Sequence, residues 1–152
     1  MLDIGSIEKH IASIEARVYN LRPNIEKKIL WAHKAAQKTS LSIVFVHGFS
    51  ATRAELSPVI EQIAFALEAN VFFTRLTGHG QDGEALSSAT FEDWTLDTNE
   101  AISVGELIGD EVILIGSSTG CSLIHSILEY QVKIKSVKLV PSYRFQTWFL
   151  KA

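Results

Sequence analysis

Apolar residues recur along the chain at two spacings, one helical and one extended. Near the N-terminus they repeat every three or four positions, the period of an amphipathic helix. This stripe consists of Ile4, Ile7, Ile11, Ile14 and Val18. It predicts a helical segment within residues 1–22 that ends near Asn20 and Pro23. A strand is predicted next, over 25–33, with one apolar face made of Ile25, Ile29 and Trp31.

Short β-branched runs begin at residue 41 and alternate with stripes of helical period. Further strands are predicted at 41–47, 71–76, 111–115 and 134–140. The run at 41–47 is apolar almost throughout, which is typical of a strand buried on both faces. We expect Pro141 to end the last strand, because proline has no amide N–H to pair.

Helices are predicted between these strands. The first starts at Ser57-Pro58, since proline suits the first helical turn, and Thr52-x-x-Glu55 before it matches a capping box. Its expected apolar stripe is Ile60, Ile63, Ala64 and Leu67. Strands that alternate with helices favour right-handed βαβ units, and therefore an α/β fold with a mostly parallel sheet flanked by helices.

Two more helices complete the pattern. One opens with Thr90-x-x-Asp93 and runs to about Ile108, with Asp93 as a cap and Trp94 as a packing residue. The other follows residues 116–120. Its apolar stripe is Leu123, Ile124, Ile127 and Leu128.

The composition fits one globular domain and excludes a disordered chain. Of 152 residues, 47% are apolar and 20% are charged. We expect a single domain over 1–152, made of the helical segment 1–22, a sheet with its helices over 25–140, and a tail over 141–152. The tail is aromatic and basic. It suggests either a surface that contacts a membrane or nucleic acid, or the start of a lid or strand connection, which we favour.

Charge and cysteine content narrow the partners and the compartment. A net charge of −3 gives no reason to expect nucleic acid as a partner. Cys121 is the one cysteine, so it cannot form an internal disulfide. We find no apolar run long enough to span a bilayer and no signal-peptide pattern at the N-terminus. We therefore expect a cytoplasmic protein without a transmembrane segment.

Three loops at the carboxyl ends of predicted strands carry unusual residues, at 47–49, 78–80 and 116–120. The last of them fits G-x-S-x-G between a strand and a helix. Such a tight turn forces the serine into a strained backbone that exposes its hydroxyl, and it needs small neighbours, here Gly116 and Gly120. Ser118 is thus the candidate nucleophile. A chance match or a nucleotide-binding glycine loop is the alternative, but no phosphate-binding glycine motif is present.

The other two loops supply candidate supporting groups. An acyl-transfer site needs two backbone N–H donors for the oxyanion, and Thr119 and Phe49 are the candidates, with Gly48 allowing close approach. For the His47 imidazole we favour a structural, hydrogen-bonded role. His79 either lines the pocket entrance or braces its loop, and we favour bracing.

Taken together, His47-Gly48-Phe49, Thr77-Gly78-His79-Gly80, Glu92-Asp93-Trp94 and the G-x-S-x-G turn resemble the α/β-hydrolase superfamily over about 25–140. The branch resembled is that of esterases, monoacylglycerol lipases and serine-aminopeptidase-like proteins. The resemblance implies that Ser118 attacks an ester, amide or thioester carbonyl. It also implies that Phe49 and Thr119 form the oxyanion hole. Cys121 is a mild departure from the small residue that the family often has after the elbow.

The activating half of a catalytic triad is not evident. In this fold the acid and then the histidine follow the serine, whereas here His125 precedes Glu129. Seven residues along a helix place His125 about 10 Å from Ser118, too far for a hydrogen bond. A full hydrolase of this type needs about 250 residues. We therefore expect a C-terminally incomplete α/β-hydrolase, whose acid and histidine lie beyond residue 152.

Three functional hypotheses remain. The first is a serine hydrolase that acts on a small carboxylic ester or related acyl substrate. The second is a catalytically inactive binding module or remnant that keeps the pocket. The third is acyl transfer to an acceptor other than water. No metal or organic cofactor is implied, because no cluster has the spacing of metal ligands. An exposed sheet edge would permit self-association.

Overall fold

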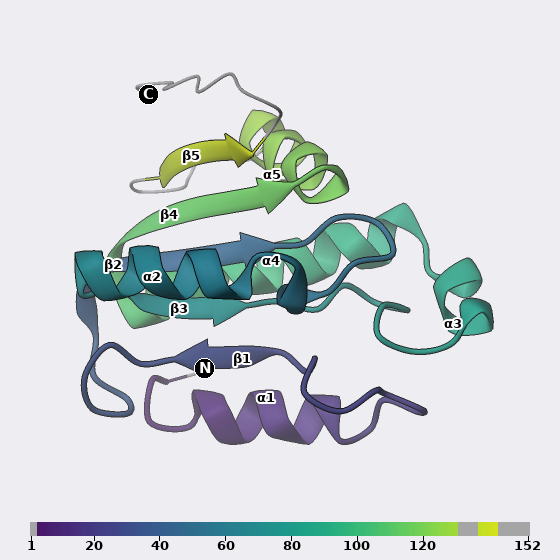
Figure 1. The fold of residues 1–152 in the computed structure, drawn as a ribbon, viewed down its shortest axis with the longest axis horizontal. Coiled ribbons are helices and arrows are strands. Elements are labelled where there is room, and N and C mark those ends of the chain that lie inside the picture. Colours follow the sequence, from purple (N-terminus) through teal and green to yellow (C-terminus); the bar gives the residue numbers. More distant parts are fainter. Residues whose placement is uncertain (1–2, 131–136, 143–152) are drawn as a thin grey trace.

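The part of the chain that the structure describes is built around one five-stranded sheet (Figure 1). The computed structural model describes residues 3–130 and 137–142. The spatial order of the strands is β1-β3-β2-β4-β5. Their bounds are Lys28–Leu30 (β1), Thr39–Val46 (β2), Asn70–Phe73 (β3), Gly109–Ser117 (β4) and Val137–Ser142 (β5). Strands β2 to β5 are parallel and β1 is antiparallel to β3, which confirms a mostly parallel sheet.

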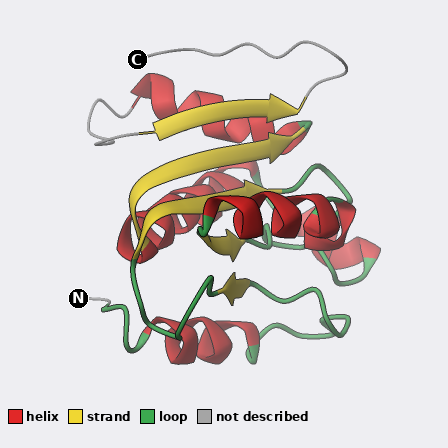
Figure 2. Cartoon of the chain, turned by 60° about the vertical axis from the view of Figure 1, so that its left-hand side comes forward, coloured by secondary structure: helices red, strands yellow, loops and turns green. Residues whose placement is uncertain are grey.

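Helices cover both faces of this sheet (Figure 2). Their bounds are Ile7–Glu15 (α1), Ser57–Leu67 (α2), Gly83–Ser88 (α3), Phe91–Ile108 (α4) and Thr119–Tyr130 (α5), with a short 3-10 helix, η1, at Arg53–Glu55. One apolar cluster joins α1, α4 and α5 to one face of the sheet. A second cluster joins α2 to the other face. The layered α/β fold predicted from the strand and helix periods is confirmed.

Strand β2 shows why the central run is apolar throughout. Its neighbours Val44 and Phe45 point to opposite faces, and each belongs to a different apolar cluster. Both side chains are fully buried. From Ser42 to Val46 every residue of β2 is buried, because helices cover both faces there, so each side chain is apolar or hydrogen-bonded.

The N-terminal elements are shorter than predicted. Helix α1 ends at Glu15, before the Asn20 at which the stripe was expected to stop, and Asn20 itself has a left-handed backbone with φ of 58°. Strand β1 covers three residues of the nine predicted over 25–33. Periodicity marks the apolar face of such a segment, whereas hydrogen bonding to β3 extends only over Lys28–Leu30.

Helix α2 begins at Ser57, with Pro58 in its first turn, as predicted. Only part of its expected stripe is buried: Ile60 and Ala64 face the sheet, while 38% of Ile63 and 43% of Leu67 remain exposed. The four residues lie on one helix, as predicted, but of these only Ile60 and Ala64 belong to the buried core.

Strand β3 also ends before the predicted Leu76, because the backbone turns away after Phe73. Leu76 is still buried, but its N–H donates to the His47 ring rather than to a neighbouring strand.

Helix α4 confirms the sequence prediction closely. The Thr90 hydroxyl accepts a hydrogen bond from the Asp93 N–H, and the Asp93 carboxylate accepts one from the Thr90 N–H, so the capping box is complete. The helix ends at Ile108, as expected. Helix α3 was not predicted; Asp82 caps it by accepting from the Ala85 N–H.

The C-terminal strand differs from its prediction. Strand β5 continues through Pro141 to Ser142, so proline does not end it. Among the described residues β5 is at the edge of the sheet, and an edge strand tolerates proline. The predicted start of this strand at 134–136 and the tail over 143–152 lie outside the described residues. Within the described ranges, no helix has the length and apolar character needed to cross a membrane.

Candidate active site

The G-x-S-x-G sequence forms a sharp turn between β4 and α5, at the carboxyl end of the sheet (Figure 1). Ser118 is the turning residue. Its φ of 47° lies in the left-handed region, and its side chain is exposed. For a residue with a Cβ such a backbone costs on the order of 1–3 kcal/mol, so the surrounding structure must hold it there. The result is a hydroxyl displayed at the rim of the sheet.

Two glycines permit this turn. A Cβ on Gly116 would lie 2.6 Å from the Cys121 nitrogen, and one on Gly120 would lie 2.1 Å from the Val46 carbonyl oxygen. Both contacts are with backbone atoms, which cannot move aside as a flexible side chain would. The first turn of α5 is thereby packed directly against the end of β2.

The loop after β2 lies against the same turn. A Cβ on Gly48 would be 3.3 Å from the Ser117 carbonyl oxygen, so glycine allows the close approach predicted for it. Among the described residues, neither the Phe49 N–H nor the Thr119 N–H donates a hydrogen bond. Thr119 is also the first residue of α5, where the helix dipole favours negative charge. Thr119 directly follows Ser118 in the chain, and Phe49 follows Gly48, on which a Cβ would lie 3.4 Å from the Ser118 Cβ.

His47 is buried beneath this loop and has no free ring nitrogen. Its Nε2 accepts from the Leu76 N–H at 3.1 Å, which leaves Nδ1 protonated to donate to the Gly48 carbonyl at 2.9 Å. Burial lowers the pKa of His47 to about 4. A neutral ring with both nitrogens engaged fits the structural role favoured from the sequence.

His79 has a parallel arrangement. Its Nε2 accepts from the Ser50 N–H at 3.1 Å, and its Nδ1 donates to the Thr77 carbonyl at 3.2 Å. Burial lowers the pKa of His79 as well. The two histidine rings lie 4.8 Å apart between centroids, so both loops rest on one pair of neutral rings. These contacts connect the loop after β2 to the loop after β3, the bracing role that we favoured for His79.

Aromatic rings cover the histidine pair on the solvent side. Phe49 is 56% exposed, and its ring lies 6.0 Å from those of His79 and Trp94. The Trp94 Nε1–H donates to the Thr77 carbonyl at 2.9 Å. Trp94 therefore packs as predicted, and it also anchors the loop that carries His79.

The loop after β3 is held from behind by charged groups that sequence reasoning missed. Asp97 on α4 accepts from the Thr77 N–H at 2.6 Å and pairs with Lys27 at 3.2 Å. Lys27 also pairs with Glu100. The sequence shows these as isolated charges, and their partners are about seventy positions away, so no local pattern could have revealed the network.

Glu55 was missed for a different reason. The capping-box pattern predicted that its carboxylate would turn back to Thr52. In the structure Thr52 accepts from the Ala54 N–H, and the Glu55 carboxylate accepts from the Ser117 hydroxyl at 3.1 Å and from the Gly48 N–H at 3.5 Å. The capping-box interpretation of Glu55 was therefore wrong, because the side chain has better donors across the sheet edge.

The residues after the elbow are placed as expected from the helix. His125 and Glu129 lie 3.8 Å apart on α5, with side chains that are 63% and 65% exposed. The Cys121 thiol donates to the Gly116 carbonyl, within the elbow itself. Over 3–130 and 137–142 we find no histidine placed to accept the Ser118 proton, and no cluster of three or more metal-ligating side chains.

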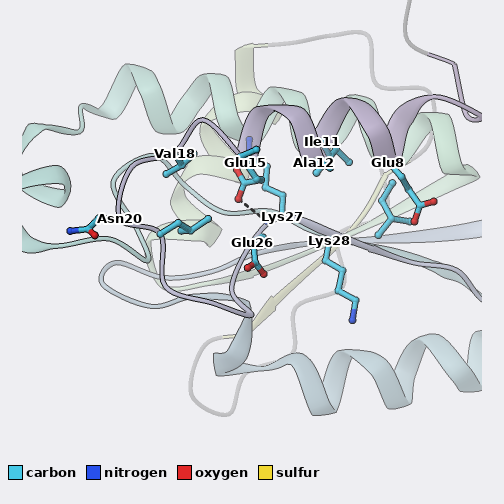
Figure 3. Close-up of a pocket in the computed structure, with 12 residues that line it drawn as sticks. Glu8, Ile11, Ala12, Glu15, Val18, Asn20, Glu26, Lys27 and Lys28 are labelled. Carbon is cyan, nitrogen blue, oxygen red and sulfur yellow. Dashed lines mark hydrogen bonds between the residues drawn. The ribbon is translucent and has the colours of Figure 1, made fainter.

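A hollow of about 770 Å³ lies elsewhere, between α1 and the segment before β1 (Figure 3). Figure 3 shows Glu15 bonded to the Lys27 backbone at its wall; the N–O distance is 3.0 Å. Glu8, Glu26 and Lys28 add charges of both signs. This hollow is at the β1 side of the sheet, whereas the elbow follows β4, so it is not the site of the candidate nucleophile.

Solved structures of similar fold cover most of this chain. One of LipS and LipT, two metagenome-derived lipolytic enzymes, matches with a TM-score of 0.65 and 21% identity over 84% of this chain and 50% of its own. Alpha/beta hydrolase domain-containing protein 10 from mouse matches with a TM-score of 0.52 and 20% identity, over 79% and 46%. The putative non-heme bromoperoxidase BpoC from Mycobacterium tuberculosis H37Rv matches with a TM-score of 0.53 and 15% identity, over 82% of this chain and 42% of its own.

These likenesses show a shared fold. The chain spans about half the length of the structures it matches. A search of curated protein sequences gives no match. The model of the alpha/beta hydrolase family matches residues 43–146, which include the second half of β2, the elbow and α5. The chain therefore belongs to the alpha/beta hydrolase family.

Proposed function

We propose that this protein is a serine hydrolase that cleaves a small carboxylic ester, or a related acyl bond, through an acyl-enzyme on Ser118. The observation that carries the proposal is the strained, exposed backbone of Ser118 between two glycines that admit no Cβ. Strained backbone of this kind is enriched at functional sites, and here it displays a hydroxyl. Membership of the alpha/beta hydrolase family supports the same proposal.

The proposed chemistry follows from the groups around the hydroxyl. Ser118 Oγ attacks the carbonyl carbon, and the carbonyl oxygen becomes an oxyanion. The free N–H groups of Phe49 and Thr119 donate to that oxygen, and the N-terminus of α5 favours its negative charge. The proton of the Ser118 hydroxyl passes to the leaving oxygen as its bond to the carbonyl carbon breaks, so the alcohol departs neutral. Water then attacks the acyl carbon, releases the carboxylic acid and returns a proton to Ser118 Oγ. Removing one such donor from an oxyanion hole costs about 10²–10³ in kcat in enzymes of this chemistry.

The second candidate is a catalytically inactive binding module of the same fold. One observation favours it: His47 and His79 have both ring nitrogens engaged, and His125 is exposed on α5 beside Glu129. A serine hydroxyl is a weak nucleophile without a base that accepts its proton. No such base is found among the described residues.

A fluorophosphonate probe separates the two candidates, because it phosphonylates activated serines. The folded protein, the Ser118→Ala variant and the matched control Ser122→Ala, an exposed serine one turn along α5, are incubated with the probe and digested. The hydrolase predicts labelling of the peptide that contains Ser118 in the wild type and the control, and none in Ser118→Ala. Folded wild-type protein that stays unlabelled would support the binding module instead.

A further inference from the structure

Glu55 joins two segments that are far apart in sequence. Its Oε1 accepts from the Ser117 hydroxyl at 3.1 Å, and its Oε2 accepts from the Gly48 N–H at 3.5 Å. Ser117 directly precedes the candidate nucleophile, and Gly48 directly precedes Phe49. One carboxylate therefore links the loop after β2 to the turn after β4.

The backbone that carries Glu55 is itself held in place. Thr52 caps the 3-10 helix η1, and the Glu55 N–H donates to the Thr52 carbonyl at 3.0 Å. The Arg53 guanidinium donates to the Asn24 carbonyl at 2.7 Å and to the Glu26 carbonyl at 3.2 Å. These bonds fasten η1 to the segment before β1, so the carboxylate extends from a fixed turn.

The two segments that Glu55 joins are those that present the proposed oxyanion donors. Phe49 follows Gly48, and Thr119 follows Ser118 in the elbow. Donors in such a site are effective only when they are already directed at the position of the developing charge. A tie between the two segments fixes the spacing of the donors, in addition to the close backbone contact at Gly48.

We propose that Glu55 is a positioning residue that holds the Phe49 and Thr119 amides at the spacing that an oxyanion needs; this rests on the proposed acyl-transfer function. Its role is geometric and not electrostatic. A carboxylate beside developing negative charge opposes that charge, so a purely electrostatic role would slow the reaction. Hydrogen bonds to a charged acceptor are stronger than those between neutral groups, and here they connect two loops.

The test uses Glu55→Ala, Glu55→Gln and the matched control Glu106→Ala, which removes an exposed carboxylate from α4. The first readout is the rate of labelling of Ser118 by the fluorophosphonate probe. We expect Glu55→Ala to slow it by about tenfold, which corresponds to the loss of one such hydrogen bond. Glu55→Gln, which keeps one acceptor oxygen, should fall between, and the control should match the wild type. Labelling of Glu55→Ala at the wild-type rate or faster would overturn the proposal.

The second readout does not depend on catalysis. Hydrogen exchange of the segments 47–51 and 116–121 should rise together in Glu55→Ala and stay unchanged in Glu106→Ala. Ser117→Ala should accelerate exchange in the same two segments, and the double variant should add little to Glu55→Ala, because that change already breaks the bond to Ser117. If the wild type fails to label, the proposed function fails, while coupled exchange would still support the tie made by Glu55. Unchanged exchange in Glu55→Ala would overturn the tie.

Discussion

The Glu15 carboxylate at the end of α1 forms a bidentate ion pair with the Arg75 guanidinium, with two N–O distances of 2.8 Å. Both side chains are buried. Arg75 also donates to the His79 carbonyl at 3.2 Å. The N-terminal helix is thus bonded to the loop that carries His79, on which the Phe49 loop rests. The Glu15–Arg75 ion pair therefore contributes both to the stability of the fold and to the position of the loop that carries His79.

Arg75→Ala should destabilise the fold by about 3–5 kcal/mol, because it leaves the Glu15 carboxylate buried without its partner. The measurement is urea unfolding followed by circular dichroism. The matched control is Asp110→Ala, which breaks the ion pair between Asp110 and Lys38. The side chains of this pair are 70% (Asp110) and 44% (Lys38) exposed. That variant should lose less than about 1 kcal/mol. Equal losses in the two variants would show that the buried pair is unimportant.

Stability should fall as the pH falls from 7 to 5. Burial lowers the pKa of His47 from 6.5 to about 4, so in this range the unfolded chain binds a proton that the folded chain does not. The free energy of unfolding should therefore drop by about 2 kcal/mol between these pH values, and further as the pH approaches 4. Urea unfolding titrations at each pH measure this free energy of unfolding.

His47→Gln removes that titrating group and should reduce the pH dependence. Burial also lowers the pKa of His79, so the variant should keep a smaller slope, and the addition of His79→Gln should flatten it further. A His47→Gln variant with the full wild-type slope would contradict the assignment of the effect to this ring.

Gly120→Ala should destabilise the protein by about 1–3 kcal/mol or more, because its Cβ would lie 2.1 Å from the Val46 carbonyl oxygen. Gly83→Ala is the matched control: nothing lies within 4 Å of its Cβ, and alanine is the better helix former, so a gain of up to about 1 kcal/mol is expected. Thermal unfolding of both variants is the measurement. Equal midpoints would refute the steric account of the elbow.

The fold was largely predictable because its signals are local. The apolar run of β2 and the Thr90–Asp93 capping box each lie within a few residues, and each predicted its element correctly. The outcomes that the sequence did not predict depend on neighbouring elements, which a local sequence pattern does not specify. Ile63 shares an apolar stripe with the buried Ile60 but stays partly exposed, and Pro141 continues a strand because that strand is at an edge of the described sheet.

In the candidate site, too, the local features were predictable from the sequence and the long-range contacts were not. The G-x-S-x-G turn, with Ser118 at its centre, was visible in the sequence because its steric demands fall on residues two positions away. Glu55 bonds to Ser117 and Arg75 bonds to Glu15, and neither pair was visible because its members lie 62 and 60 positions apart. A local interpretation of Glu55 as a capping residue was available, and only the fold showed that its carboxylate bonds elsewhere.

The central claim is that Ser118 becomes acylated. It is tested most directly by mass spectrometry of the folded protein quenched within milliseconds to seconds of mixing with a short-chain p-nitrophenyl ester. The account predicts an acyl adduct on the peptide that contains Ser118, formed as nitrophenol is released, and no adduct in Ser118→Ala. An adduct on another residue, or none on folded wild-type protein, would contradict it.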